Sequence, residues 1–303
     1  MTGSSGLIGT SVCRSLVTDG YEPVTMDIRP SQYNEFKPRF HDITDRREVK
    51  KAVKDIQGVI HLAAVSRVID AQNAPNLCRH VNVEGTKNIL TSLSNHQKQP
   101  WIVYGSSREV YGEPKKLPVT ENHRLEPINV YGESKVEAEK LISDYCFREN
   151  AAAIIFRFSN VYGSVYDHST RVVPAFVRFA LQGKAVRMDC PDHVFDFTHV
   201  DDTSDAIMRG VDSLIENKME GVDSFNVSPG EGTSLTELIM IIGEIIGNNV
   251  ATFPGEKRSY DVKRYVGDCT KLEAILGYVC KIKIKEGLTT FCNEFREFLH
   301  RGK

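Results

Sequence analysis

Three apolar segments separated by stretches of helical patterning constrain the fold more than any other feature of this sequence. They span residues 58–64, 101–105 and 153–158. Unbroken apolar character is typical of strands that are buried on both faces of a parallel sheet. Because strands and helices alternate along the chain, we predict an α/β fold built on a doubly wound parallel sheet. A chain of 303 residues is long enough for one large domain or two moderate ones.

The composition argues against several classes of partner. The formal net charge of −2 gives no electrostatic reason to expect nucleic acid or an anionic membrane surface. No apolar run approaches the roughly 20 residues of a membrane helix, and the first residues are polar and rich in glycine, unlike a signal peptide. We therefore expect a cytoplasmic protein with no nucleic-acid or membrane partner. The seven cysteines are dispersed and never paired as Cys-x-x-Cys, which favours reduced, mostly buried thiols, and we expect no metal site.

A glycine-rich turn opens the chain and leads into a segment of helical pattern. Gly3, Gly6 and Gly9 are spaced so that the backbone can approach a pyrophosphate closely, and the N-terminus of the following helix attracts its negative charge. Residues 23–27 read as a short strand that ends in Asp27, about 20 residues on, where a carboxylate can bind an adenosine ribose. This favours NAD over NADP, although Arg29 can accept a 2′-phosphate and Asp27 can equally be a turn residue.

The strand that normally precedes such a turn is missing. Only Met1 and Thr2 stand before Gly3, whereas a buried strand needs roughly five residues. We expect either that an intact version begins further upstream or that this chain lacks the first, central strand of its sheet. In the second case both cofactor binding and stability are in doubt.

Tyr131 and Lys135 lie four residues apart in a segment of helical pattern. Residues at this spacing share one face of a helix, so both side chains can point into the same cleft. A free tyrosine has a pKa of ~10, and a lysine ammonium a few ångströms away favours the phenolate and lowers that pKa. Such a pair can take a proton from a sugar hydroxyl. By itself, the same spacing is more often found on an ordinary amphipathic surface helix.

Polar residues follow the predicted strand at 101–105. Because ligands of open parallel sheets bind at the carboxyl ends of the strands, Ser107 and Glu109 are candidates for contacts with a substrate. The alternative is that they only cap the loop.

Several motifs, taken in their order along the chain, resemble those of the extended short-chain dehydrogenases/reductases. Within that group they are similar to the NAD-dependent epimerase/dehydratase family, which acts on nucleotide sugars. The likeness runs nearly end to end, and the motifs are specific together where each alone is not. They are residues 2–9, Asp27, residues 42–43, 61–64, 82–86, 106–107, 131–135 and 160–163.

The resemblance implies a Rossmann domain that binds NAD. It implies that Ser107 orients a sugar hydroxyl, that Tyr131 removes the proton of this hydroxyl as hydride moves to the nicotinamide, and that Lys135 also bonds the nicotinamide ribose. The residues that it implies in cofactor binding are Gly3, Gly6, Leu7, Ile8, Gly9, Asp27, Arg29, Asp42, Ile43, Leu62, Ala63, Ala64, Asn82 and Lys135.

The carboxyl-terminal third matches the family less well. The resemblance implies that Asn160 contacts the substrate phosphates and that Arg171 belongs to the segment that closes over the nucleotide. It also implies that Arg258 grips the diphosphate, which suits guanidinium geometry, while Asp261 holds the nucleoside ribose. Without the resemblance, Asn160 reads as a turn cap and Arg258 as a solvated surface charge. Phe195 stands where the family usually carries arginine, so one phosphate contact is absent or replaced.

A 4-epimerase and a 4,6-dehydratase differ in the groups that they need. A 4-epimerase needs a base, a cofactor and room for the oxidised sugar to turn. A 4,6-dehydratase must also protonate a leaving hydroxyl, and family members place an Asp-Glu pair directly after the catalytic serine or threonine. Here the pair reads Arg108-Glu109, and arginine, with a pKa above about 12, cannot act as that acid. Arg108 either faces solvent or meets an anionic sugar such as a uronic acid.

We therefore expect a nucleotide-sugar 4-epimerase of the UDP-glucose/UDP-galactose type, with Ser107, Glu109, Tyr131 and Lys135 as candidate catalytic residues. A dehydratase, a decarboxylase or a reductase of the same family is the alternative. A further alternative of another class is a nucleotide sensor or binding module. The presence of Ser107, Tyr131 and Lys135 favours an enzyme.

We predict two intertwined lobes and a dimer. The NAD-binding Rossmann domain covers residues 1–162 with returns near 194–227, and a smaller α+β substrate-binding lobe covers residues 163–193 and 228–303. Relatives commonly dimerise through the helix that bears the tyrosine, so Val136, Leu141 and Tyr145 are either interface or core residues. Tyr265 sits where a bulky residue is thought in relatives to exclude N-acetylated sugars, which favours a plain UDP-hexose as the partner.

Overall fold

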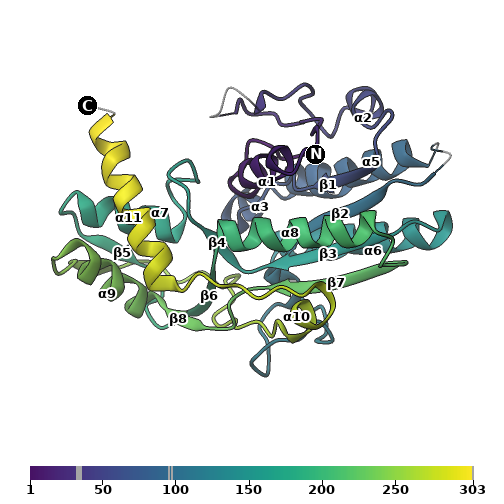
Figure 1. Cartoon of the computed structure of the whole chain (residues 1–303). Helices are drawn as coiled ribbons and strands as arrows, with labels where there is room; N and C mark the ends of the chain where they lie inside the picture. Colours follow the sequence, from purple (N-terminus) through teal and green to yellow (C-terminus); the bar gives the residue numbers. More distant parts are fainter. Residues whose placement is uncertain (32–35, 95, 97, 302–303) are drawn as a thin grey trace.

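A four-stranded parallel sheet forms the centre of the molecule, for which a computed structural model describes residues 1–31, 36–94, 96 and 98–301 (Figure 1). Its order is β1-β2-β3-β7, where β1 is Gly58–His61, β2 is Trp101–Ser107, β3 is Ala153–Phe158 and β7 is Val222–Val227. In this register Ile60 pairs with Val103, and Phe156 pairs with Phe225. The doubly wound parallel sheet predicted from the sequence is thereby confirmed.

Helices cover both faces of the sheet and bury a separate apolar cluster on each. On one face, α1 (Leu7–Thr18), α8 (Val200–Ile215) and α10 (Thr270–Leu276) cover side chains such as Ile154 and Phe225. On the other face, α2 (Arg46–Ala52), α5 (Gly85–Leu93) and α6 (Val130–Glu149) cover Ile102 and Ile155. Each fully buried aliphatic side chain contributes about 1.5–3 kcal/mol, so the two clusters fix the sheet between its helices.

Met1 and Thr2 extend the parallel sheet beyond β1. Thr2 pairs in parallel with His61 on one side and with Met26 on the other, and Met26 pairs with Phe40. These contacts are isolated bridges and not full strands. The strand predicted over residues 23–27 is reduced to Met26, because the neighbouring segment that pairs with it consists only of Met1 and Thr2. The spatial order from Phe40 through Met26, Thr2 and β1 to β2 is that of a Rossmann sheet.

Between β1 and α6 the chain forms shorter elements that surround the ends of the strands. They are α3 (Val68–Asn73), α4 (Pro75–Arg79), a π-helix (His80–Glu84) that continues into α5, and a 3-10 helix (Arg108–Tyr111) directly after β2. The π-helix and the 3-10 helix both contain residues that the sequence analysis assigns to the site.

A second group of elements lies at one end of the sheet (Figure 1). β4 (Asn160–Tyr162), β6 (Val194–His199) and β8 (Gly232–Ser234) form one small sheet, and β5 (Val186–Met188) pairs with β9 (Thr252–Pro254). α7 (Val172–Leu181), α9 (Leu235–Ile246) and α11 (Ile284–Arg301) enclose a third apolar cluster with Val177, Leu238 and Phe291. The exact division into the two lobes proposed above stays a prediction.

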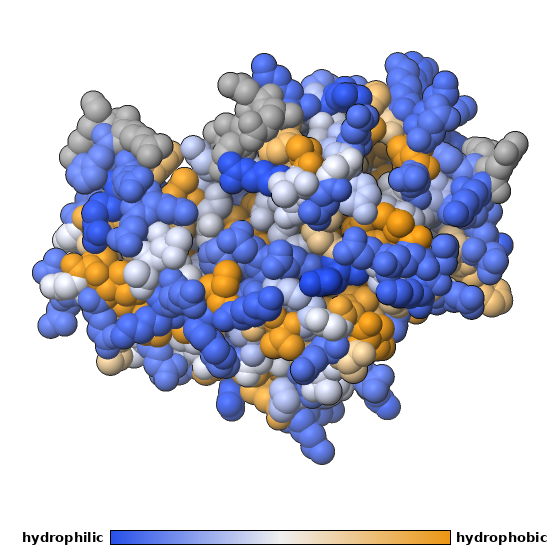
Figure 2. All heavy atoms as spheres, viewed as in Figure 1, coloured by the Kyte–Doolittle hydropathy of each residue, from blue (hydrophilic) through white to orange (hydrophobic). Residues whose placement is uncertain are grey.

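The three side chains considered for a dimer interface differ in burial. Tyr145 is buried between α6 and the sheet, and Val136 and Leu141 are half-buried against apolar clusters. Figure 2 shows polar side chains over most of the drawn face, with separate apolar patches between them. Core packing therefore accounts for Tyr145, whereas an interface role of Val136 and Leu141 and the homodimer itself stay predictions.

All seven cysteines are free thiols, and six of them are buried, as predicted. Among the described helices, none is long and apolar enough to cross a membrane. In the same part of the chain, no group of three or more His, Cys, Asp and Glu side chains could hold a metal ion.

Candidate active site

β2 and α6 bring Ser107, Tyr131 and Lys135 together. Asn129 caps the N-terminus of α6 by accepting a backbone N–H of the first turn, at 2.8 Å, so Tyr131 and Lys135 fall on the first two turns. Tyr131 is 8% exposed and Lys135 only 2%. The ammonium of Lys135 donates to the backbone oxygen of Gly105 at 2.7 Å, which ties it to the strand that carries Ser107.

Burial dominates the titration of this tyrosine. Burial raises the pKa of Tyr131 to about 12, although Arg171 and a hydrogen bond with the Ser107 hydroxyl act in the opposite direction. Burial also lowers the pKa of Lys135 to about 8. The Lys135 nitrogen lies 5.8 Å from the Tyr131 ring centroid and 4.7 Å from that of Tyr104. The shift in the protein alone is thus opposite to the one predicted from the spacing, because desolvation of a phenolate outweighs its attraction to nearby cations.

Glu109 has a partner on each carboxylate oxygen. Its Oε1 lies 2.9 Å from an Nη of Arg108, and its Oε2 accepts a hydrogen bond from Asn129 Nδ2 at 2.7 Å. Glu109 therefore holds Arg108 in place and ties it to the start of α6, while the catalytic role assigned to Glu109 from the sequence stays a prediction. The motifs do not indicate Asn129 as a residue that supports the site, although the preference for asparagine just before a helix could have identified it.

Arg108 is buried, so the solvent-facing alternative is wrong. It is 7% exposed, and its Nε donates to Asn160 Oδ1 at 2.9 Å. Asn160 begins β4, which brings the predicted phosphate contact next to the end of β2.

The glycine turn has the shape that a pyrophosphate site requires. Gly3 has a φ of +70°, and a Cβ there would lie 2.7 Å from the backbone nitrogen of Ala63. A Cβ on Gly9 would lie 1.9 Å from the carbonyl oxygen of Gly3. Gly6 is the N-cap of α1 and supplies no side-chain cap, so the first backbone N–H groups of α1, at Leu7 and Ile8, remain available to an anion. Leu62, Ala63 and Ala64 are half-buried where β1 ends beside this turn.

Asp27 is placed to receive a ribose. It is 7% exposed, and its two oxygens accept the backbone N–H groups of Ser5 at 2.9 Å and Arg29 at 2.8 Å. The Arg29 guanidinium lies 3.7 Å from the same carboxylate, with its side chain 50% exposed. A 2′-phosphate here would face the buried carboxylate at close range, so the arrangement fits NAD better than NADP.

Three predicted cofactor residues take part in holding the fold. Asp42 Oδ1 accepts the backbone N–H of Thr44 at 2.8 Å, and Ile43 is buried in the cluster under α2 and α5. Asn82, on the π-helix, accepts from Val65 N at 2.8 Å and donates to Ser134 Oγ at 2.9 Å. Asn82 thus links the segment after β1 to α6 through these two hydrogen bonds. Contacts of these three residues with a cofactor stay predictions.

The predicted substrate residues Arg171 and Arg258 each pair with an acid a few residues away, and Arg171 also contacts Ser66 from another segment. An Nη of Arg171 donates to Ser66 at 3.2 Å, and its Nε lies 3.7 Å from Asp167 Oδ1. Arg258 donates to Asp261 Oδ2 at 2.8 Å, and its side chain is 33% exposed. Arg171 and Arg258 therefore hold their charge at the surface, unlike Arg108.

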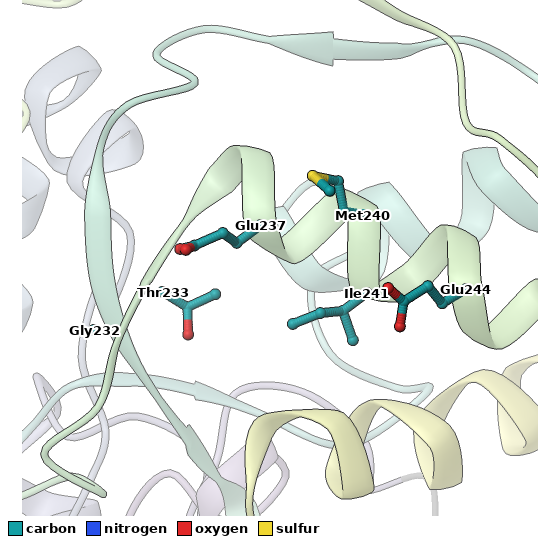
Figure 3. Close-up of a pocket in the computed structure, with 6 residues that line it drawn as sticks. All are labelled: Gly232, Thr233, Glu237, Met240, Ile241 and Glu244. Carbon is teal, nitrogen blue, oxygen red and sulfur yellow. The ribbon is translucent and has the colours of Figure 1, made fainter.

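A shallow hollow of about 290 Å³ lies elsewhere, over α9 and β8 (Figure 3). None of the residues assigned to the site lines it. Its lining residues are Gly232, Thr233, Glu237, Met240, Ile241 and Glu244.

The fold and these side chains define a class of protein. A Rossmann sheet, a glycine turn at the N-terminus of α1, a buried aspartate beside that turn, and a buried serine, tyrosine and lysine at the carboxyl end of β2 are the parts of a short-chain dehydrogenase/reductase.

Comparison with known proteins places the chain more closely. The profile of the NAD dependent epimerase/dehydratase family matches residues 1–227. A protein of Methanocaldococcus jannaschii named putative UDP-glucose 4-epimerase is 30% identical over 97% of this chain and 96% of its own. The crystal structure of a UDP-glucose 4-epimerase from Thermotoga maritima with UDP-glucose superposes with a TM-score of 0.89 at 26% identity, covering 98% of each chain. That of a Thermus thermophilus UDP-glucose 4-epimerase with NAD gives a TM-score of 0.86 at 27% identity, covering 97% of each chain.

The chain belongs to the NAD-dependent epimerase/dehydratase family. The resemblance inferred from the motifs is thereby confirmed, and so is NAD as the cofactor of the family.

Proposed function

We propose that this protein is a nucleotide-sugar 4-epimerase of the UDP-glucose/UDP-galactose type, which uses bound NAD for transient oxidation at sugar C4. The observation that carries the proposal is the buried set of Ser107, Tyr131 and Lys135 at the end of β2. The pairing of both Glu109 oxygens supports an epimerase over a dehydratase, because a dehydratase needs an acid that is free to protonate the leaving hydroxyl.

In the proposed reaction Tyr131 acts as base and then as acid. As the phenolate, its oxygen takes the proton of the C4 hydroxyl, which Ser107 orients, and the resulting hydroxyl returns the proton after the oxidised sugar has turned over. Lys135 places a positive charge beside the rings of Tyr104 and Tyr131, and it would hydrogen-bond the nicotinamide ribose of NAD. Bound NAD, held at Gly3, Gly6, Gly9 and Asp27, would supply the hydride acceptor and a positive ring that favours the phenolate. No net redox change results.

The first test is the content and activity of the purified protein. Denaturation should release NAD, detected by mass spectrometry, and the native protein should interconvert UDP-glucose and UDP-galactose without added cofactor. Release of NADP instead of NAD would contradict the proposal. Net accumulation of NADH, or a product that has lost water or carbon dioxide, would assign the chain to another reaction of its family.

The proposed partner is a plain UDP-hexose, and the proposed assembly is a homodimer. Tyr265 is fully buried and stacks on Tyr111 with 6.2 Å between ring centroids, which supports a fixed, bulky wall. We expect much slower turnover of UDP-N-acetylglucosamine than of UDP-glucose, and equal rates would contradict the proposal that Tyr265 excludes N-acetylated sugars.

The homodimer is tested by light scattering, which should give twice the mass of one chain.

A further inference from the structure

Arg108 has one donor group that the protein does not use. Its Nε donates to Asn160, and one Nη pairs with Glu109 at 2.9 Å. The other, Nη1, is buried and has no hydrogen-bond partner among the residues that the structure describes. Arginine stays charged at any accessible pH, so a buried guanidinium N–H without an acceptor is unfavourable unless a ligand supplies one.

Aromatic rings hold the plane of this guanidinium. Its central carbon lies 4.6 Å from the Phe195 ring centroid and 5.7 Å from that of Tyr265. Stacking on aromatic faces fixes the orientation of an arginine, and its planar fork suits the oxygens of phosphates and carboxylates. Arg108 is therefore rigid before any ligand binds.

Position 195 gives a second reason to assign a ligand. The sequence resemblance predicts an arginine there, and the chain has phenylalanine. The structure places the guanidinium of Arg108 directly on that ring, beside Asn160. A positive charge thus reaches this volume from the 3-10 helix after β2 instead of from β6.

We infer that Arg108 is a substrate-binding residue whose Nη1 donates to an anionic oxygen of the sugar nucleotide. Glu109, Asn160 and Phe195 position it. The inference rests on the proposed function, since it assumes a nucleotide-sugar substrate. Two anionic functional groups on such a substrate can supply this oxygen. One is the diphosphate, which all nucleotide-diphosphate sugars carry, and the other is the carboxylate of a uronic acid sugar.

The test measures dissociation constants by calorimetry on NAD-loaded protein for UDP-glucose, UDP-glucuronic acid and uridine. The variant is Arg108→Met combined with Glu109→Gln, so that no unpaired carboxylate is buried. Glu109→Gln alone, which keeps the guanidinium, is the matched control. NAD content and melting temperature show that each variant is folded.

Loss of a charge-assisted hydrogen bond is expected to weaken binding about 10- to 100-fold in the double variant relative to the control. An equal loss for both sugar nucleotides, with uridine unchanged, assigns the diphosphate. A loss for UDP-glucuronic acid alone assigns the carboxylate. Unchanged constants for both sugar nucleotides, or a loss of the same size for uridine, overturn the inference.

A rescue variant separates charge from packing. Phe195→Arg added to the double variant should restore a large part of the lost affinity, because the two positions reach the same volume. Failure of this rescue with retained NAD content would contradict a shared anion site. A wild-type protein that binds the sugar nucleotides but does not epimerise them rejects the proposed function and leaves the binding inference intact.

Discussion

The inner wall and the rim of the candidate site are built in different ways. On the inner wall, Ser107, Tyr131 and Lys135 are each at most 8% exposed, and the carbonyl of Gly105 holds the lysine on the strand. At the rim, Arg171 and Arg258 are partly exposed and pair with acids a few residues away. The inner wall is preorganised by the sheet, whereas the rim consists of loops. Changes to the inner wall should therefore alter kcat, and changes to the rim should alter KM.

The largest expected effect comes from the base. Tyr131→Phe should lower kcat by about 10²- to 10⁴-fold, since it removes the proton acceptor, while NAD content stays at the wild-type level. Tyr145→Phe is the matched control, because Tyr145 is buried on the same helix but bonds Gln99, and it should keep wild-type turnover. Similar kcat values in the two variants would contradict a special role of Tyr131 on the inner wall.

Lys135 should make stability depend on pH. Its pKa is about 8 in the folded protein, against 10.5 for an unperturbed lysine, so between these values the unfolded chain binds a proton that the folded protein has released. The free energy of unfolding therefore rises with pH in that window, by about 2 kcal/mol between roughly pH 8 and pH 10, relative to Lys135→Met. Urea titrations at the two pH values measure it. Lys140→Met, on the exposed side of α6, is the control and should keep the wild-type pH dependence of the free energy of unfolding. The same pH dependence in Lys135→Met and in the wild type would show that the Lys135 ammonium is well solvated in the folded protein.

A rim arginine should give a smaller and different effect. Arg258→Gln should raise KM for the sugar nucleotide about 5-fold with kcat nearly unchanged, because its charge is screened by solvent and shared with Asp261. Steady-state kinetics beside Lys257→Gln, which removes the same charge one residue away, isolates the position. A fall in kcat without a change in KM would place Arg258 with the inner wall.

The smallest effect is expected on the outer face of α6. Arg79 pairs there with Glu133 at 2.8 Å and with Glu137 at 3.1 Å, and all three side chains are more than 40% exposed. Arg79→Gln should lower the free energy of unfolding by about 0.5 kcal/mol and leave kcat/KM unchanged. A loss of activity here would show that the inner wall depends on surface charge.

Short-range spacing carries most of what can be predicted from the sequence. The glycine turn, Asp27 and the Tyr131–Lys135 pair follow from patterns within one turn or one βα unit, and the Rossmann sheet follows from the alternation of elements. The surroundings of Arg108 cannot be predicted in this way, because Asn160 and Phe195 lie 52 and 87 positions further along the chain and meet Arg108 only through β4 and β6.

The titration of Tyr131 shows the same limit. The spacing to Lys135 correctly indicates a shared face, but it carries no information on how completely α6 covers the phenol. Burial, which reverses the direction of the pKa shift, is a property of the packed whole. The strand predicted at residues 23–27 is too long because its pairing depends on the neighbouring segment and not on its own residues.

The stacking of Arg108 on Phe195 also constrains how this lineage can diverge. Side chains 4.6 Å apart share one volume, so arginine at both positions would force two like charges together in a buried place, and arginine at neither would remove the cation altogether. Exchange between the two arrangements therefore requires two codon changes, each unfavourable alone. We therefore expect positions 108 and 195 to change together, so that one cation always occupies this buried volume.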